Sequence, residues 1–141
     1  MLRNNLSEAI DHLKKFEFRP KTIIDVGVAY GTEGLYGKYK GAYYVLVEPL
    51  QEYEASCQNL TRKFGGEYVL AAASDSVGKI QINVHPDLSG SSLFNESEGP
   101  HVDGEPRMVP TTTLDDICQK THILGPFLLK IDTQGAELKV L

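Results

Sequence analysis

The stretch from Thr22 to Thr32 constrains the fold more than any other part of the chain. It is a short apolar run that stops at an acid, Asp25, and then passes through two glycines, Gly27 and Gly31. This pattern is typical of a buried strand that turns sharply into a helix. Glycine can adopt positive φ and lets a ligand approach the backbone, while the free N–H groups of the following helix point at that ligand. We therefore expect a nucleotide-like ligand at this turn.

A second apolar run, residues 43–47, also ends at an acid, Glu48, about 17 residues after Gly31. In a doubly wound sheet, an acid at the carboxyl end of the second strand lies beside the first turn and can accept hydrogen bonds from ribose hydroxyls. The sequence thus predicts that two acids and two glycines meet at one crevice. The alternative is a tight turn that binds no ligand, because turn glycines are common.

The glycine spacing separates two cofactor classes. A dinucleotide site normally has the pattern Gly-x-Gly-x-x-Gly, whose backbone wraps a negatively charged pyrophosphate. This chain instead has Asp25-x-Gly27-x-x-x-Gly31. Asp25 would repel a pyrophosphate but suits a ligand with an ammonium and a sulfonium group, so the pattern resembles the first motif of S-adenosylmethionine-dependent methyltransferases. A nicotinamide-dependent oxidoreductase fits Glu48 but neither Asp25 nor the wide glycine spacing.

Length and charge narrow the class of protein further. The 141 residues are of a size for one domain, residues 1–141, and the net charge of -5 offers no basic surface for nucleic acid or an anionic membrane. Cys57 and Cys118 lack metal-ligand spacing, so we expect buried thiols and no metal site. No apolar run approaches the roughly 18 residues of a membrane span, and residues 1–15 are charged and amphipathic, so we expect a cytoplasmic protein. None of these features specifies an oligomeric state.

Hydrophobic periodicity predicts the other elements. A helix is expected at residues 7–16 with Ser7 as N-cap, and a short one after the glycine turn, which Gly37 and Gly41 weaken and close. Two more helices are expected, one at about 49–64 and one after the N-cap Thr113. The helix at 49–64 carries an apolar stripe that we interpret as core packing, formed by Leu50, Tyr53, Cys57, Leu60 and Phe64. Strands are expected at 22–25, 43–48, 68–73 and 127–132, with an antiparallel edge ribbon at 79–84.

Two further segments carry candidate binding residues. Strand 68–73 runs into Ser74 and Asp75, which could receive the exocyclic amine of an adenine; the alternative is a turn-forming Ser-Asp pair. Residues 85–109 lack periodicity and predict a long loop. Our hypothesis is that this loop, with Ser91 and Ser92, covers the methyl-transfer site and helps to choose the acceptor; an ordinary surface excursion is the alternative.

Asp132 ends the strand predicted at 127–132, and that strand end should border the same crevice as the first strand. Asp132 could act as general base towards an acceptor hydroxyl, hold that hydroxyl, or bind the ammonium of the cofactor. A divalent cation is a fourth possibility, but one acid provides too few ligands to predict it. Glu137, one turn into the next helix, is interpreted as complementing the helix dipole.

Taken together, these stretches resemble the FkbM family of S-adenosylmethionine-dependent methyltransferases. The matching segments are residues 24–27 with Gly31, 47–49, 73–75 with Gly78, 90–92, 113–116 and, most specifically, the block Lys130-Ile131-Asp132-Thr133-Gln134-Gly135-Ala136-Glu137. The resemblance implies O-methylation of a hydroxyl on a sugar or polyketide-like small molecule, with S-adenosyl-L-methionine as cofactor. Our hypothesis assigns Asp25, Gly27 and Gly31 to the methionine end, Glu48 to the ribose, Ser74 and Asp75 to the adenine, and Asp132 to catalysis.

The implied fold is the Rossmann-like, doubly wound, mostly parallel α/β sheet of class I methyltransferases, with strand order 3-2-1-4 and a β-ribbon insertion. The chain departs from the family at Ala29, where a polar Asn is usual, and at Leu141, where it ends inside the helix after strand four. That class normally has seven strands, so we expect the last three to be lacking. Both departures favour an alternative function, a non-catalytic cofactor-binding or scaffold domain of the same fold.

Overall fold

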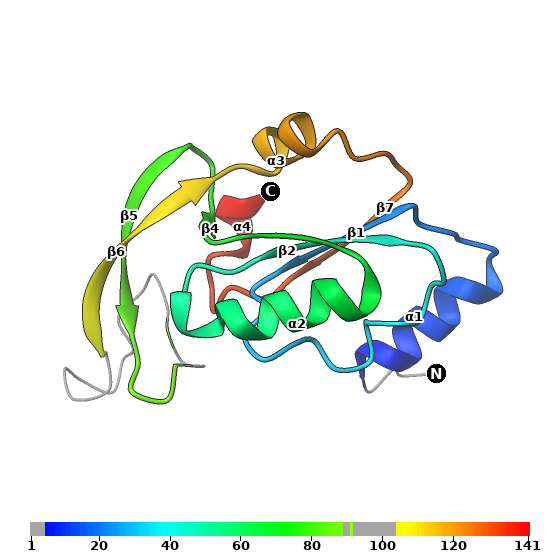
Figure 1. Ribbon diagram of the computed structural model, residues 1–141, viewed down its shortest axis with the longest axis horizontal. Helices are drawn as coiled ribbons and strands as arrows, with labels where there is room; N and C mark the ends of the chain where they lie inside the picture. The colour runs from blue at the N-terminus through cyan, green and yellow to red at the C-terminus, as the bar shows by residue number, and fades with distance from the viewer. Residues whose placement is uncertain (1–4, 89–90, 92–103) are drawn as a thin grey trace.

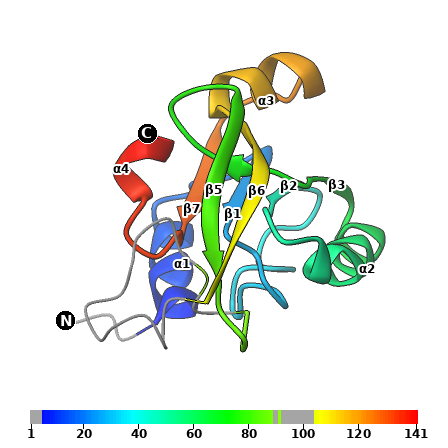
Figure 2. The ribbon, with the colours of Figure 1, turned by 90° about the vertical axis from the view of Figure 1, so that its left-hand side faces the viewer.

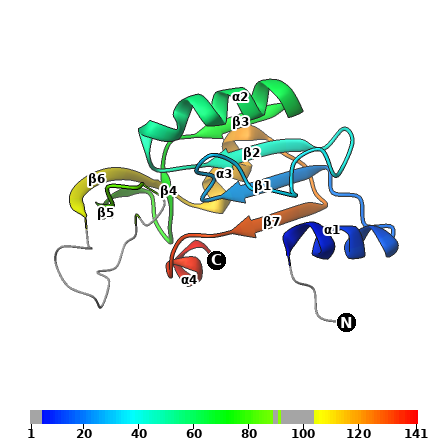
Figure 3. The same cartoon turned by 90° about the horizontal axis from the view of Figure 1, so that it is seen from below.

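The computed structural model describes residues 5–88, 91 and 104–141. Its centre is a parallel four-stranded sheet of order β3-β2-β1-β7, which Figure 3 shows with the strands side by side. The strands are β1 (Thr22–Val26), β2 (Tyr43–Val47), β3 (Gly66–Val69) and β7 (Phe127–Ile131). With β7 as the fourth strand of this sheet, the predicted order 3-2-1-4 is confirmed. The mixed α/β architecture is consistent with a Rossmann-like methyltransferase fold.

Helices cover both faces of this sheet. Successive side chains of β1 alternate between the two faces, and all five of its residues are buried. Ile23 packs in one cluster with Ile10 of α1 (Leu6–Lys15) and Cys57 of α2 (Glu54–Phe64). Ile24 packs in another cluster with Ile117 of α3 (Leu114–Thr121). In Figure 1, α1 and α2 accordingly lie below the sheet, while α3 and α4 (Glu137–Val140) lie above it.

A second sheet of order β4-β6-β5 lies beyond the strand ends of the first sheet (Figures 1 and 2). It consists of β4 (Ala72–Ala73), β5 (Gly78–Val84) and β6 (Glu105–Thr112). β5 pairs antiparallel with β6, which confirms the predicted edge ribbon, and β4 pairs parallel with β6. The ribbon therefore borders the edge of the main sheet at which the predicted acids are found.

The prediction of a helix directly after the glycine turn is wrong. Residues 28–41 form a series of turns, and φ is positive at Ala29 and at the glycines Gly31, Gly34, Gly37 and Gly41. A right-handed helix needs φ near -60°, so these repeated positive values prevent one from continuing. No helix N-terminus therefore follows β1 to point at the crevice.

Three boundaries also differ from the prediction. The strand expected at 68–73 is divided, because β3 pairs with β2 while Ala72 and Ala73 cross to β6 in the other sheet. The loop expected at 85–109 ends earlier, since β6 begins at Glu105. The N-cap of α1 is Asn5 rather than Ser7, and its side chain accepts a hydrogen bond from Glu8 N. The Thr113 N-cap is confirmed by its bond from Asp116 N.

Helix α2 is preceded by a short 3₁₀ turn, η1 (Gln51–Tyr53). This turn follows Glu48 and Pro49 directly, and its last residue, Tyr53, is buried. The predicted helix at 49–64 is thus built from two consecutive pieces. The turn brings Tyr53 to the strand-end edge of the sheet, beside Val47 and Glu48.

Candidate functional site

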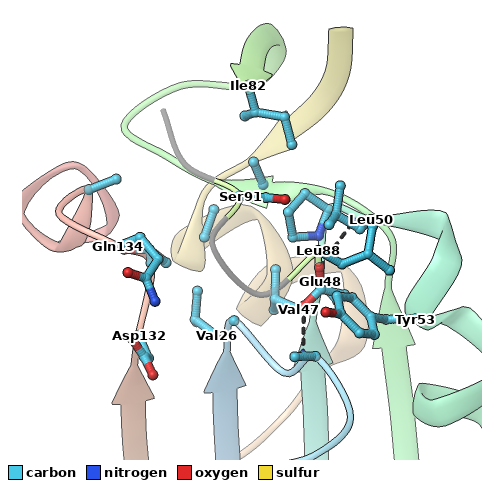
Figure 4. A pocket seen from close by; sticks show the side chains of 17 residues that line it. Val26, Val47, Glu48, Leu50, Tyr53, Ile82, Leu88, Ser91, Asp132 and Gln134 are labelled. Carbon is cyan, nitrogen blue, oxygen red and sulfur yellow. Dashed lines mark hydrogen bonds between the residues drawn. The ribbon is translucent and has the colours of Figure 1, made fainter. Parts of the chain in front are cut away.

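A cavity of about 230 Å³ lies where β1, β2 and β7 end (Figure 4). Its walls include Val26 and Val47 at two strand ends, Ile82 of the ribbon, and Leu88 and Ser91 from the segment after β5. Open α/β sheets bind ligands at this position, outside the carboxyl ends of their strands. The volume is slightly below the roughly 300–1,000 Å³ of typical ligand pockets.

The structure brings together some of the residues that the sequence singled out. The predicted residues that line the cavity are Gly27, Glu48, Ser91 and Asp132. Those that do not line it are Asp25, Gly31, Ser74 and Asp75. Ser92 falls outside the described residues. The cofactor and acceptor roles assigned to these residues stay predictions.

Glu48 closes the glycine turn with its carboxylate. Its Oε2 atom accepts hydrogen bonds from Val28 N at 3.0 Å and Ala29 N at 2.9 Å, and its Oε1 atom accepts one from Leu50 N at 3.0 Å. The residue is only 4% exposed, and burial raises its pKa against the opposing effect of these N–H groups and of Lys130. A carboxylate offers about four acceptor positions, so these three hydrogen bonds leave about one position unfilled.

Asp25 is directed into the interior rather than into the cavity. It is fully buried, and its Oδ1 atom lies 2.9 Å from Lys130 Nζ. Its Oδ2 atom accepts hydrogen bonds from the hydroxyls of Thr32, at 2.7 Å, and Tyr36. Lys130 forms an ion pair with Asp25 and donates a hydrogen bond from Nζ to Gly27 O at 2.6 Å. This network holds the glycine turn from beneath.

Lys130 was not predicted from the sequence as the partner of Asp25. A signal was present, because Lys130 interrupts an otherwise apolar strand. In the parallel register of β1 and β7, Asp25 lies directly opposite Lys130. A lone lysine in a central strand next to a strand with a lone aspartate is an ion-pair candidate, since buried charges are usually paired.

Gly27 joins the three strand ends. Its φ is 78°, and a Cβ atom at this position would lie 1.9 Å from the backbone oxygen of Asp132. Gly27 N donates to Val47 O at 2.9 Å, and Asp132 N donates to Val26 O at 3.0 Å. A glycine is therefore required here for two reasons, the left-handed conformation and the close packing against the backbone of Asp132 at the end of β7.

Asp132 begins the loop between β7 and α4, and its side chain is exposed. Glu137 closes this loop, because its Oε1 atom accepts hydrogen bonds from Thr133 N at 3.1 Å and Gly135 N at 3.2 Å. These contacts, together with the backbone N–H of Glu137 itself, lower the pKa of Glu137. Glu137 thus stabilises the start of α4, in line with its predicted role, and leaves Asp132 as the acid of this loop at the cavity.

Ser74 and Asp75 form a local turn after β4. Ser74 is buried and its N–H donates to Thr112 O at 2.8 Å. The hydroxyls of Ser74 and Ser76 both donate to Asp75 Oδ1. These contacts match the turn-forming alternative, while the preceding Ala72 and Ala73 do line the cavity.

A family model, the methyltransferase FkbM domain, matches residues 25–141. The chain belongs to the FkbM methyltransferase family. The resemblance inferred from the motifs is thereby confirmed, and the match spans every residue of the cavity named above. Membership indicates methyl transfer as the general activity. No curated protein and no solved structure gives a significant match to the chain.

The cavity of this FkbM domain has an acidic and apolar lining. Among its described lining residues, Glu48 and Asp132 are acids and none is Lys, Arg or His. The described part of the chain contains no group of three or more His, Cys, Asp or Glu side chains arranged to hold a metal ion. Within the same residues, no helix has both the length and the apolar character to cross a membrane.

Tyr53 is a cavity residue that the sequence analysis missed in this FkbM domain. The sequence assigned it to an apolar packing stripe. In the structure it is 2% exposed and lines the cavity, and its hydroxyl has no hydrogen-bond partner among the described residues. Helical spacing could not have identified it, since that signal does not separate core tyrosines from those at a cavity.

Proposed function

We propose that this protein transfers a methyl group from S-adenosyl-L-methionine to a hydroxyl of a small molecule, such as a sugar or a polyketide-like compound. The observation that carries the proposal is the acidic cavity at the strand ends of a chain that belongs to the FkbM methyltransferase family. Two carboxylates and no cationic side chain among the described lining residues suit a ligand with ammonium and sulfonium groups. The pyrophosphate of a dinucleotide would be repelled by the same groups.

The cavity residues fit the parts of S-adenosylmethionine. Leu50, Ala72, Ile82 and Leu88 give an apolar wall for the flat adenine ring. Glu48 presents its remaining acceptor direction for a ribose hydroxyl. Asp132 lies on the neighbouring β7 end, on the far side of Val26 from Glu48 (Figure 4). When bound, this cofactor supplies an electrophilic methyl group on sulfur.

Asp132 is the residue that we propose for acid–base work. Methyl transfer to oxygen is an in-line displacement, so the protein must align the acceptor and exclude water. The Asp132 carboxylate makes no hydrogen bond to any other described residue, so it is available to accept the proton of an acceptor hydroxyl. Ser91 lines the same cavity, with its Oγ held by His85 N at 3.0 Å, which supports an acceptor-side role for this segment.

The test is calorimetric titration of the chain with S-adenosylmethionine and, in parallel, with NAD. We expect saturable binding of S-adenosylmethionine alone. Transfer of a labelled methyl group is then measured with a panel of hydroxylated acceptors, monosaccharides included. Binding of NAD alone, or of neither compound, would contradict the proposal.

A non-catalytic cofactor-binding or scaffold domain is the second candidate. Ala29 favours it, because this cavity residue has φ 50° and no polar side chain where the family usually carries Asn. The two functions differ in one result. Tight binding of S-adenosylmethionine without methyl transfer to any acceptor in the panel would favour the second candidate.

A further inference from the structure

We propose that the hydroxyl of Tyr53 is a further ligand-binding group of the cavity, and that it hydrogen-bonds to the nucleoside part of S-adenosylmethionine beside Glu48. This inference rests on the proposed function and adds a residue to it. Tyr53 ends η1, the turn that immediately follows Glu48 and Pro49. Its ring points towards Glu48 at the cavity (Figure 4).

The hydroxyl of Tyr53 is a polar group that has lost its water without gaining a protein partner. Its oxygen is shielded from solvent, and no described residue accepts from it or donates to it. Buried hydroxyls are normally hydrogen-bonded, since an unpaired one is unfavourable. A ligand atom that pairs with this hydroxyl gives up its own hydrogen bond to water, so the net gain in affinity is that of one ordinary hydrogen bond.

No hydrogen bond joins Glu48 to the Tyr53 hydroxyl, which has no partner among the described residues. The Oε2 and Oε1 atoms of Glu48 are held by the backbone N–H groups of Val28, Ala29 and Leu50. The Glu48 carboxylate is thus bound by backbone N–H groups, whereas the neighbouring Tyr53 hydroxyl still needs a hydrogen-bond partner. A nucleoside can supply this hydrogen-bond partner, since it carries several hydroxyls and ring nitrogens.

The orientation of the Tyr53 ring is fixed by its neighbours. Tyr30 contacts it edge-on, with ring centroids 4.9 Å apart and an interplanar angle of 87°. Tyr53 also belongs to a buried cluster with Leu50, Ala72 and Ile82, which line the cavity too. The hydroxyl is thus held beside the apolar wall that we assign to the adenine, where a ribose or base atom would meet it.

Position at the cavity, rather than burial alone, distinguishes Tyr53. Tyr39 also has a buried hydroxyl without a partner among the described residues, and it is 6% exposed. Tyr39, however, packs in a different cluster, with Ile10 and Phe18, and does not line the cavity. It is therefore a matched control, because Tyr39→Phe removes the same chemical group away from the site.

The experiment compares the wild-type chain with Tyr53→Phe and Tyr39→Phe by calorimetric titration with S-adenosylhomocysteine and with adenosine. Thermal unfolding without ligand checks that both variants fold. We expect Tyr53→Phe to raise the dissociation constant of both compounds on the order of 3- to 10-fold, the effect of one hydrogen bond. Tyr39→Phe should leave both constants unchanged. Neither variant should lower the unfolding temperature, since each removes an unpaired hydroxyl.

The outcomes separate this inference from the proposed function. If the wild-type chain binds neither compound, the proposed function fails and the role of Tyr53 fails with it. If the wild type binds and Tyr53→Phe binds as tightly as Tyr39→Phe, the role of Tyr53 is overturned while the proposed function stands. A loss with S-adenosylhomocysteine but none with adenosine would place Tyr53 at the amino-acid end, which contradicts the nucleoside contact.

Discussion

Lys130 Nζ lies 2.9 Å from Asp25 Oδ1 beneath the glycine turn, and the two residues face each other across β1 and β7. The same ammonium donates to Gly27 O, so one cation joins a buried acid to the backbone that forms the cavity floor. The geometry of the turn therefore depends on strand β7, about a hundred residues further along the chain. The first motif and the Lys-Ile-Asp block are one structural unit.

Replacing Lys130 by Met should destabilise the fold strongly. The variant leaves the fully buried Asp25 carboxylate without its cation, a change that typically costs about 3–5 kcal/mol. Lys38→Met is the control, because its partner Asp11 is 53% exposed and a surface pair contributes about 0–1 kcal/mol. Urea unfolding of both variants measures the difference. Equal losses of unfolding free energy would show that the buried ion pair contributes no more to stability than the surface pair.

Replacing Gly27 by Ala should cost more than the same change at Gly41. Both glycines have φ 78°, so both substitutions carry the left-handed cost of about 1–2 kcal/mol. At Gly27 the new Cβ would also lie 1.9 Å from Asp132 O, whereas nothing lies within 4 Å at Gly41. We expect a total loss of about 2–5 kcal/mol for Gly27→Ala. Denaturant unfolding that gives the same loss at both positions would contradict the close packing of the strand ends.

Replacing Ala29 by Asn should stabilise the chain. Ala29 has φ 50°, a left-handed conformation that Asn adopts several-fold more readily than most residues, so a gain of about 0.5–1 kcal/mol is expected. Ala55→Asn is the opposite control: Ala55 is an exposed residue inside α2, where Asn lowers helix stability by about 0.5 kcal/mol. The unfolding temperatures of the two variants should therefore shift in opposite directions. A decrease for both would refute the prediction.

The stability contribution of Glu137 should disappear in acid. Its pKa is lowered from 4.5 by its own backbone N–H and by those of Thr133 and Gly135. The charged carboxylate is therefore more stable in the folded state than in the unfolded state. The contribution is present above pH 4.5 and is lost as the pH falls through the lower folded-state pKa. Glu137→Gln should therefore differ from wild type in unfolding temperature at neutral pH and approach it in acid, once the pH lies below the folded-state pKa. A difference that is independent of pH would contradict these bonds.

Much of the site was predictable because β1, β2 and β7 are mostly apolar runs that end at or next to an acid. Burial on both faces requires such runs in a parallel sheet. The strand ends then meet at one edge, which placed Gly27, Glu48 and Asp132 at the same cavity. The direction of a side chain at a strand end was not predictable. Asp25 points into the interior because β7 places Lys130 opposite it. The lone lysine is visible in the sequence, but the register is needed to show that the two residues face each other.

The second sheet was harder to predict for a different reason. β6 contains Pro106 and Pro110 and few apolar residues, so its sequence lacks the alternation of an ordinary strand. It is held by pairing with β5 from Gly78 to Val84, a contact between distant segments. The prediction of a helix after β1 failed for a local reason. Each glycine permits positive φ but does not require it, so the sequence does not show which glycines adopt it.

Replacing Asp132 by Asn should separate turnover from binding. The side chain is exposed and makes no hydrogen bond within the described residues, so the variant should fold as the wild type does. If Asp132 takes the proton of the acceptor hydroxyl, the rate of methyl transfer should fall on the order of 10²-fold or more, while the affinity for S-adenosylmethionine changes little. Asp11→Asn, in the surface pair with Lys38, is the control for the loss of one negative charge. Weaker cofactor binding with the turnover number preserved would instead assign Asp132 to the cofactor ammonium, and an unchanged rate with unchanged binding would remove it from the site.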